Sequence, residues 1–138
     1  MTAVQIDRNA LLEAIKDIPA NSPIVMVNLL RYRDQADYGN RSMPPCSGRV
    51  AYYQRYAVPT FEAIRNLGGR VLWFGHVQVP LFAPQDERWD DVLLVEYPSF
   101  ACVLSLVNNP LYQVSEVHRT AALLDTRVMA TTTAHEIA

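Results

Sequence analysis

The sequence has 138 residues, of which 50% are hydrophobic and 19% charged, and its formal net charge is −2. This size is typical of one domain that buries its own core, and the composition excludes a disordered chain. The charge provides no basic surface for nucleic acid or anionic lipid, and the apolar runs are too short to span a membrane. The first residues lack the apolar region of a signal peptide, so we expect a cytoplasmic protein with Cys46 and Cys102 as reduced thiols.

The first twenty residues predict a helix that begins after Asp7 and ends at Pro19, with apolar residues at helical spacing between them. Residues 24–31 form an apolar run that starts with β-branched residues and predict the first strand. Residues 32–47 are polar and rich in Gly and Pro, so they predict a long loop, of the length used for lids and partner contacts.

From Gly48 to Leu67 the apolar residues recur three or four apart and predict a helix. Pro59 removes a backbone donor in the middle of it, so we expect a kink or break there. Gly68-Gly69 ends the helix, with one glycine in the left-handed conformation. A strand over residues 70–79 and a polar loop over 80–90 follow.

The last third of the chain predicts a strand, two helices and a strand. The first strand covers 91–97, Ser99 starts a short helix, Asn109-Pro110 starts another that ends near Leu123, and the final strand covers 125–132. With the elements before them they give the order β-α-β-β-α-β, which predicts an α+β, ferredoxin-like antiparallel sheet in the order 4-1-3-2. We therefore expect a single domain over residues 1–138, with an N-terminal helical extension (1–20), a core (24–132) and a tail (133–138).

Alternation along the strands sorts their residues into two faces. The face expected to meet the helices carries Val25, Val27, Leu29, Val71, Trp73, Val77, Leu93, Val95, Tyr97, Val128 and Ala130. The opposite face is assigned Met26, Asn28, Leu30, Leu72, Phe74, His76, Gln78, Val92, Leu94, Glu96, Arg127, Met129 and Thr131. This second face is also mainly apolar although the fold provides no helices for it, so a second copy of the sheet is expected to cover it in a barrel-like homodimer.

Polar residues interrupt the second face and are the candidate catalytic groups. Asn28 and Glu96 lie on neighbouring strands of the predicted order, which places them close together inside the barrel. A carboxylate there must be paired, hydrogen-bonded or protonated, with His76, Arg127 or a ligand as its partner. Two interpretations follow: an internal hydrogen-bonded network, or a pocket in which Glu96 or His76 moves a proton and Asn28 donates to an oxyanion.

Four further residues are candidates for substrate binding. Arg31 ends the first strand, where it either binds an acidic group or forms a surface ion pair. Tyr52 and Tyr56 share a helix face and either edge a pocket or pack at a surface or subunit interface. Trp89 either covers the pocket or anchors the second loop.

No metal site is expected, because His76, His118 and His135 share no metal-ligand spacing and no Cys-x-x-Cys motif occurs. Haem held by His76 in a barrel pocket is the alternative. Glu116 and Arg119 are three residues apart on one helix and are expected to form an exposed ion pair.

Six segments, in this order, resemble a known family. They are Met26-Val27-Asn28-Leu29-Leu30-Arg31-Tyr32, Tyr52-Tyr53-Gln54-Arg55-Tyr56, Gly68-Gly69-Arg70, Trp89-Asp90, Val95-Glu96-Tyr97-Pro98-Ser99, and Asn109-Pro110-Leu111-Tyr112-Gln113 with Arg119 beyond. The family is domain of unknown function 1330, in the dimeric α+β barrel superfamily; the resemblance covers about residues 24–132. It implies a ferredoxin-like fold and a barrel dimer but supplies no reaction, since the superfamily includes cofactor-free monooxygenases, muconolactone isomerases and haem-dependent enzymes.

Two functions of different classes are therefore predicted. The first is a small cofactor-independent enzyme, monooxygenase- or isomerase-like, acting on a hydrophobic, aromatic or keto-acid-like metabolite inside the barrel. The alternative is a non-catalytic ligand-binding or stress-related module of the same fold. A barrel whose interior is simply filled, with Glu96 paired to Arg127, is a third possibility.

Overall fold

A computed structural model describes residues 3–135. Its elements are α1 (Arg8–Ala14), the short helix η1 (Ile15–Asp17), β1 (Ile24–Tyr32), α2 (Gly48–Val50), the π-helix η2 (Ala51–Tyr56), α3 (Ala57–Asn66), β2 (Arg70–His76), β3 (Asp91–Tyr97), α4 (Phe100–Asn108), α5 (Pro110–Ala122) and β4 (Leu123–Thr131). The predicted elements are all present, with ends that differ by a few residues. The predicted tail lies partly outside the described residues.

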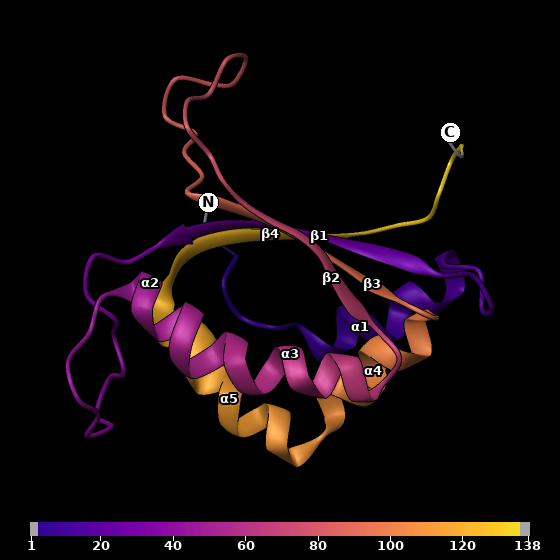
Figure 1. The fold of residues 1–138 in the computed structure, drawn as a ribbon, viewed down its shortest axis with the longest axis horizontal. Coiled ribbons are helices and arrows are strands. Elements are labelled where there is room, and N and C mark those ends of the chain that lie inside the picture. Colours follow the sequence, from indigo (N-terminus) through magenta and orange to yellow (C-terminus); the bar gives the residue numbers. More distant parts are fainter. Residues whose placement is uncertain (1–2, 136–138) are drawn as a thin grey trace.

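The four strands form one antiparallel sheet in the order β2-β3-β1-β4, which is the predicted order seen from the other edge. The central strands β1 and β3 pair from Ile24 opposite Tyr97 to Leu30 opposite Asp91. The helices of the described residues all lie on one face of the sheet and leave its other face uncovered by helix (Figure 1). The fold is therefore ferredoxin-like, as predicted.

Local signals start and end the helices as expected. The side chains of Asp7 and Asn109 accept hydrogen bonds from backbone amides of the first turns of α1 and α5, at 3.0 and 2.8 Å. Gly68 ends α3 with a φ of 83°, a left-handed conformation that favours glycine. None of the described helices is long and apolar enough to cross a membrane.

The helical run from Gly48 to Asn66 is continuous, but it widens into a π-helix over residues 51–56, just before Pro59. A proline inside a helix lacks an N–H donor and clashes with the carbonyl one turn earlier, and a wider turn relieves that clash. The helix therefore passes through Pro59 without the predicted break, and the irregularity is a π-helical turn one turn earlier. The wider turn also brings Tyr52, Tyr53 and Tyr56 toward the sheet.

The sheet register corrects the predicted faces of β1. Asn28 lies opposite Leu93, and Met26 opposite Val95, so these residues share the face that packs on the helices. The prediction placed Met26, Asn28 and Leu30 on the uncovered face and was wrong, because both faces of β1 are apolar and alternation alone cannot tell them apart.

A β-bulge corrects the faces of β2. The register shifts between Val71 and Trp73, so Phe74 and His76 lie opposite Leu93 and Asp91 on the helix side. Trp73, predicted to face the helices, lies on the other side with 54% of its side chain exposed. One extra residue reverses every later side chain, which is why period-two reasoning failed beyond it.

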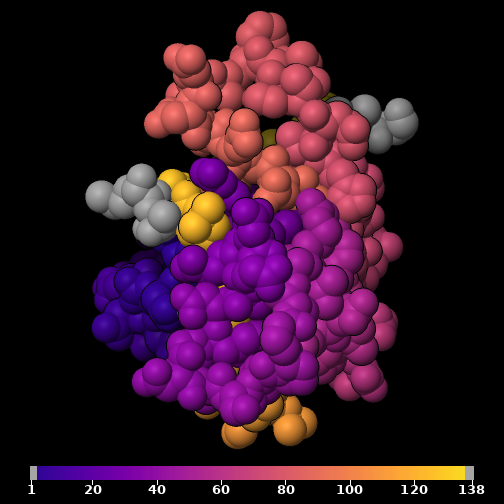
Figure 2. Space-filling model, turned by 90° about the vertical axis from the view of Figure 1, so that its left-hand side faces the viewer, coloured from indigo at the N-terminus to yellow at the C-terminus, as the bar shows by residue number. Residues whose placement is uncertain are grey.

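The uncovered face is nonetheless mainly apolar, as predicted, although with other members. It carries Val25, Val27, Leu29, Trp73, Val92, Leu94 and Met129, together with Arg70, Glu96 and Arg127. Residues 77–90, between β2 and β3, project beyond the body of the molecule (Figures 1 and 2). Their tip exposes Leu81 and the whole of Phe82. The sheet and this projection together form an apolar surface unusual for a monomer.

Candidate functional site

A cavity of about 460 Å³ lies between the sheet and the helices. Residues of β1, β3, β4, η2, α3, α4 and α5 form its walls, and the N-terminal segment with α1 borders it. Most of the lining is apolar, including Met26, Phe61, Ile64, Leu93, Val95, Phe100, Val103, Leu106 and Val107. A volume of this size accommodates a small organic molecule.

Polar side chains interrupt this apolar lining: Gln5, Asp7, Asn28, Tyr52, Tyr56, Thr60, Tyr97, Tyr112, Arg119, Thr126 and Arg127. The hydroxyls of Tyr56 and Tyr112 share a hydrogen bond of 2.8 Å. The Asn28 amide donates to the Leu93 carbonyl at 3.2 Å. The buried Thr60 hydroxyl makes no hydrogen bond of standard geometry within residues 3–135, although its interaction with Tyr56 acts to lower the pKa of that phenol. Unsatisfied buried polar groups are rare in native proteins, so an interaction with a bound molecule is a natural explanation.

Burial raises the pKa of three of the cavity phenols, Tyr52, Tyr56 and Tyr112, above the ordinary value. The positive charge of Arg119 acts on all three in the opposite direction but does not cancel the effect of burial. At neutral pH these groups are therefore neutral hydroxyls that can donate a hydrogen bond.

Arg119 is the only arginine lining the cavity whose side chain is buried, at 6% exposure, within the described residues. Its Nη1 donates to the Val4 carbonyl at 2.7 Å, and it forms no ion pair within residues 3–135. The predicted ion pair with Glu116 is wrong, since Glu116 binds Arg8 at 2.7 Å instead. A buried cation without an anionic partner is destabilising, so the site favours a ligand that brings a negative charge.

A second polar cluster surrounds Asp91 at the far end of the sheet. One Asp91 oxygen accepts from His76 Nδ1 at 2.7 Å, and the other from the Tyr32 and Tyr53 hydroxyls at 2.6 and 2.5 Å. Arg49 Nη1 reaches both oxygens, at 3.2 and 3.0 Å. Asp91 is fully buried, whereas 61% of the His76 side chain is exposed.

Burial by itself raises the pKa of Asp91, but the hydrogen bonds from His76, Tyr32, Tyr53 and Arg49 outweigh it and hold the pKa below its usual value. The carboxylate therefore stays ionised and fixes the His76 ring through Nδ1. This arrangement directs the second ring nitrogen away from Asp91, as in an acid–base pair. The rings of Tyr32 and Tyr52, 5.6 Å apart, join this cluster to the cavity wall.

The structure brings together only part of the predicted site. Asn28, Tyr52 and Tyr56 line the cavity, and His76 joins Asp91 outside the lining. Glu96 lies on the opposite face from Asn28 and pairs with Arg70 at 3.1 Å, not with Arg127, so the predicted proximity of Asn28 and Glu96 is wrong.

Arg31 and Trp89 also lie outside the cavity lining. Arg31 stands opposite Asp125 of β4 on the uncovered side of the sheet. Trp89 packs beneath the Arg127 guanidinium, 5.4 Å from the ring centre, which is consistent with anchoring the 77–90 projection.

Sequence reasoning missed Tyr112, Arg119 and Asp91. A signal for the first two was present, because Tyr112, Ser115 and Arg119 recur at helical spacing on the buried face of α5. No comparable signal marked Asp91, since an acidic residue at the start of a strand is ordinarily solvated.

The described residues contain no group of three or more His, Cys, Asp and Glu side chains arranged to hold a metal ion. Cys46 and Cys102 are both free. His76, the candidate haem ligand, is bound to Asp91 at the surface, and the cavity lining of the described residues includes no imidazole.

Comparison with known proteins found similarity only to solved structures, since no protein-family model and no curated protein matches the chain. A crystal structure of the methylated RPA0582 protein is 31% identical, with a TM-score of 0.87, over 98% of each chain. A second structure of RPA0582, described as a protein of unknown function from Rhodopseudomonas palustris, is 29% identical, with a TM-score of 0.86, over 99% of this chain and 100% of that one. A dimeric protein of unknown function and ferredoxin-like fold from Bacteroides fragilis is 13% identical, with a TM-score of 0.48, over 83% of this chain and 100% of that one.

Proposed function

We propose a function from the geometry of the cavity, because the chain belongs to the same family as the RPA0582 protein of Rhodopseudomonas palustris, whose own function is unknown. The segments that resemble domain of unknown function 1330 support placing this family there. Those segments supply Asn28, Tyr52, Tyr56, Tyr112 and Arg119, all of which line the cavity.

The proposed function is the binding of a small hydrophobic acid in the cavity. The observation that carries it is the buried Arg119 guanidinium, which has a neutral carbonyl as its partner and no anion. A ligand carboxylate would form a charge-assisted hydrogen bond with Arg119, while the apolar walls would take up a ring or alkyl chain. The Thr60 hydroxyl provides a further polar contact.

Titration with phenylacetate and with uncharged phenylacetamide, followed by NMR of the backbone amides, tests this proposal. We expect phenylacetate to shift the amides around the cavity and to bind more tightly than the amide. Arg119→Gln should weaken phenylacetate binding by about tenfold or more, the effect of losing one hydrogen bond to a charged group. Arg119→Lys keeps the charge and should lose less, and Arg65→Gln, an exposed arginine of α3, is the matched control.

Equal affinity for the acid and the amide, or an unchanged affinity in Arg119→Gln, would contradict the proposal. Because Arg119 also holds Val4, thermal unfolding of each variant should accompany the titration. A variant that melts as the wild type does but no longer binds isolates the loss of the ligand contact.

Cofactor-independent catalysis in the same cavity is the second candidate, and the neutral phenols favour it. Tyr52 and Tyr56 are hydrogen-bond donors in a mainly apolar site, where they would stabilise an oxyanion that develops on a keto acid, whereas the Asn28 amide already donates to the Met26 and Leu93 carbonyls. The tautomerisation of phenylpyruvate, followed by ultraviolet absorbance, is a suitable test. Acceleration that falls about tenfold in Tyr52→Phe supports an enzyme, whereas binding without acceleration supports a non-catalytic module.

A homodimer through the uncovered sheet face completes the proposal. The apolar residues of that face and of the 77–90 projection need cover, and a second copy presents a surface of the same kind. Packing two such sheets face to face gives the barrel that the family resemblance implies.

A further inference from the structure

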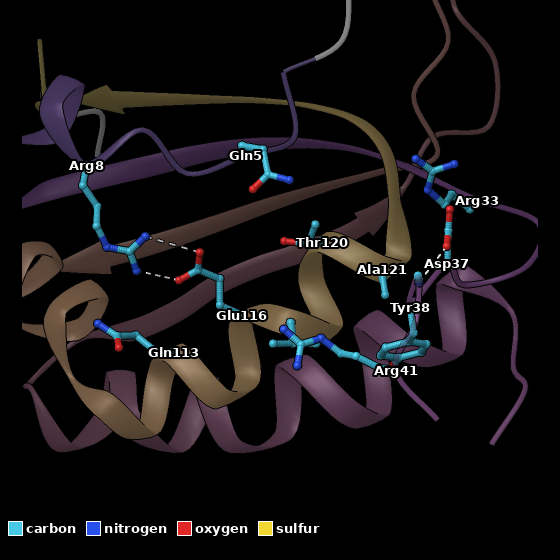
Figure 3. Close-up of a pocket in the computed structure, with 12 residues that line it drawn as sticks. Gln5, Arg8, Arg33, Asp37, Tyr38, Arg41, Gln113, Glu116, Thr120 and Ala121 are labelled. Carbon is cyan, nitrogen blue, oxygen red and sulfur yellow. Dashed lines mark hydrogen bonds and ion pairs between the residues drawn. The ribbon is translucent and has the colours of Figure 1, made fainter. Parts of the chain in front are cut away.

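A broad groove of about 680 Å³ lies on the outside of the molecule, between α5 and the loop after β1 (Figure 3). Three arginines line it, Arg8, Arg33 and Arg41, against two carboxylates, Asp37 and Glu116. Arg8 neutralises Glu116 with bonds of 2.7 and 3.4 Å. The groove therefore carries a net positive charge, which attracts acids.

Residues 3–7 separate this groove from the interior cavity. Gln5 lines both spaces, while Ala3, Ile6 and Asp7 line only the cavity. Figure 3 shows Gln5 on this segment, above α5 and facing the groove. The two spaces would become continuous if this short piece of chain moved aside.

Two backbone hydrogen bonds and the partly buried side chains of Val4 and Ile6, which pack against the core, hold residues 3–7 in place. The Val4 carbonyl accepts from Arg119 at 2.7 Å, and the Ala3 amide donates to Asp125 at 2.9 Å. The following helix α1 has no buried residue and is tied to α5 by the Arg8–Glu116 ion pair. Residues 3–14 pack on the core only through partly buried side chains, and a segment of this kind opens locally at lower free energy than the core itself.

We infer that the groove is the access route by which an acidic ligand reaches the cavity, and that residues 3–7 are its gate. The Val4 carbonyl holds the place on Arg119 that the ligand carboxylate takes when the gate moves. A carboxylate is the stronger acceptor for a guanidinium, so the exchange favours the bound state. This inference rests on the proposed binding of an acid in the cavity.

Arg8→Gln tests the gate, because it breaks the ion pair without touching the cavity lining. Lys16→Gln is the matched control, since it breaks an exposed ion pair with Glu13 in the same extension. In hydrogen exchange without ligand, we expect the amides of residues 4–11 to exchange about fivefold faster in Arg8→Gln than in the wild type. This factor corresponds to the free energy of a surface ion pair at the upper end of the usual range. Association and dissociation of phenylacetate should accelerate by a similar factor.

Gln113→Trp tests the route from the opposite direction. Gln113 is an exposed residue that lines the groove and not the cavity, so a bulky ring there should slow association and dissociation several-fold at unchanged affinity. Unchanged rates in both Arg8→Gln and Gln113→Trp, or exchange over residues 4–11 equal to that of Lys16→Gln, would overturn the gate. The proposed ligand site is tested separately, by the titration of Arg119→Gln with phenylacetate. Because the hydrogen-exchange measurement needs no ligand, it can contradict the gate without bearing on the ligand site.

Discussion

Asp91 shows how a single buried charge is kept ionised by its neighbours. It receives hydrogen bonds from two phenols, an imidazole and a guanidinium, each from a different place in the sequence. Hydrogen bonds to a charged acceptor are about twice as strong as those between neutral groups. Loss of the Asp91 carboxylate would leave its buried donors without an acceptor. The stability of this end of the sheet therefore depends on one carboxylate.

Replacing Asp91 by Asn should lower the free energy of unfolding by about 3 kcal/mol at neutral pH, because the donors lose a charged acceptor. The pKa of Asp91 is lowered in the folded state. Its contribution is therefore fully present above the unfolded pKa of about 3.9 and is lost as pH falls through the folded pKa.

Chemical denaturation of both proteins from pH 7 to pH 3 provides the measurement. The difference in stability should stay constant at neutral pH and narrow below about pH 4. Asp86→Asn, in the exposed projection, is the control and should change little. A difference that persists undiminished at pH 3 would show that the charge is not its source.

At the scale of elements, the helical run from α2 to α3 builds both polar sites. Its π-helical turn presents Tyr52 and Tyr56 to the cavity and Tyr53 to Asp91. Arg49, which also binds Asp91, lies in α2 just before this turn. The start of this run is fixed by Gly48, whose amide donates to the Arg33 carbonyl at 3.0 Å. Close backbone packing at Gly48 therefore sets the position of all four side chains.

Gly48→Ala should destabilise the protein by more than about 2 kcal/mol, because the new methyl group would overlap the backbone carbonyls of Arg33 and Ala122. Gly39→Ala is the comparison, since Gly39 has a φ of 63° and open space around it. It should lose only about 1 kcal/mol for the left-handed conformation. Equal melting temperatures for the two variants would contradict this account.

At the scale of the whole molecule, helices cover one face of the sheet, and no helix among residues 3–135 covers the other (Figure 1). The exposed Trp73, Leu81 and Phe82 lie on or beside the uncovered face. The proposed dimer would remove this surface from water, and apolar area is the main source of free energy for such association.

Val27→Arg should weaken that dimer by about a hundredfold or more, because a charge at the centre of the face would be buried without a partner. Leu111→Arg is the control, since Leu111 is exposed on α5, away from the sheet. Native mass spectrometry across a dilution series measures the effect. A wild-type monomer at micromolar concentration, or equal dimer fractions in the two variants, would rule out the sheet face as the interface.

The sequence by itself determined the elements, their order and hence the sheet topology. Apolar spacing marked the helices, β-branched runs marked the strands, and caps such as Asp7, Asn109 and Gly68 marked helix ends. These signals are local, because they depend on residues within a turn of one another. The sequence also predicted that the uncovered face of the sheet is apolar. This prediction does not depend on the register, because both sets of alternating strand residues are mainly apolar.

Only the tertiary structure decided which side chains meet. Both faces of β1 are apolar, so alternation placed Asn28 on the same face as Glu96, which was wrong, and the bulge in β2 reversed Trp73, Phe74 and His76. The cavity combines Arg119 with residues far from it in the sequence, including Ile6, Asn28 and Tyr52. Such contacts depend on register and on packing between distant segments, which no local pattern encodes.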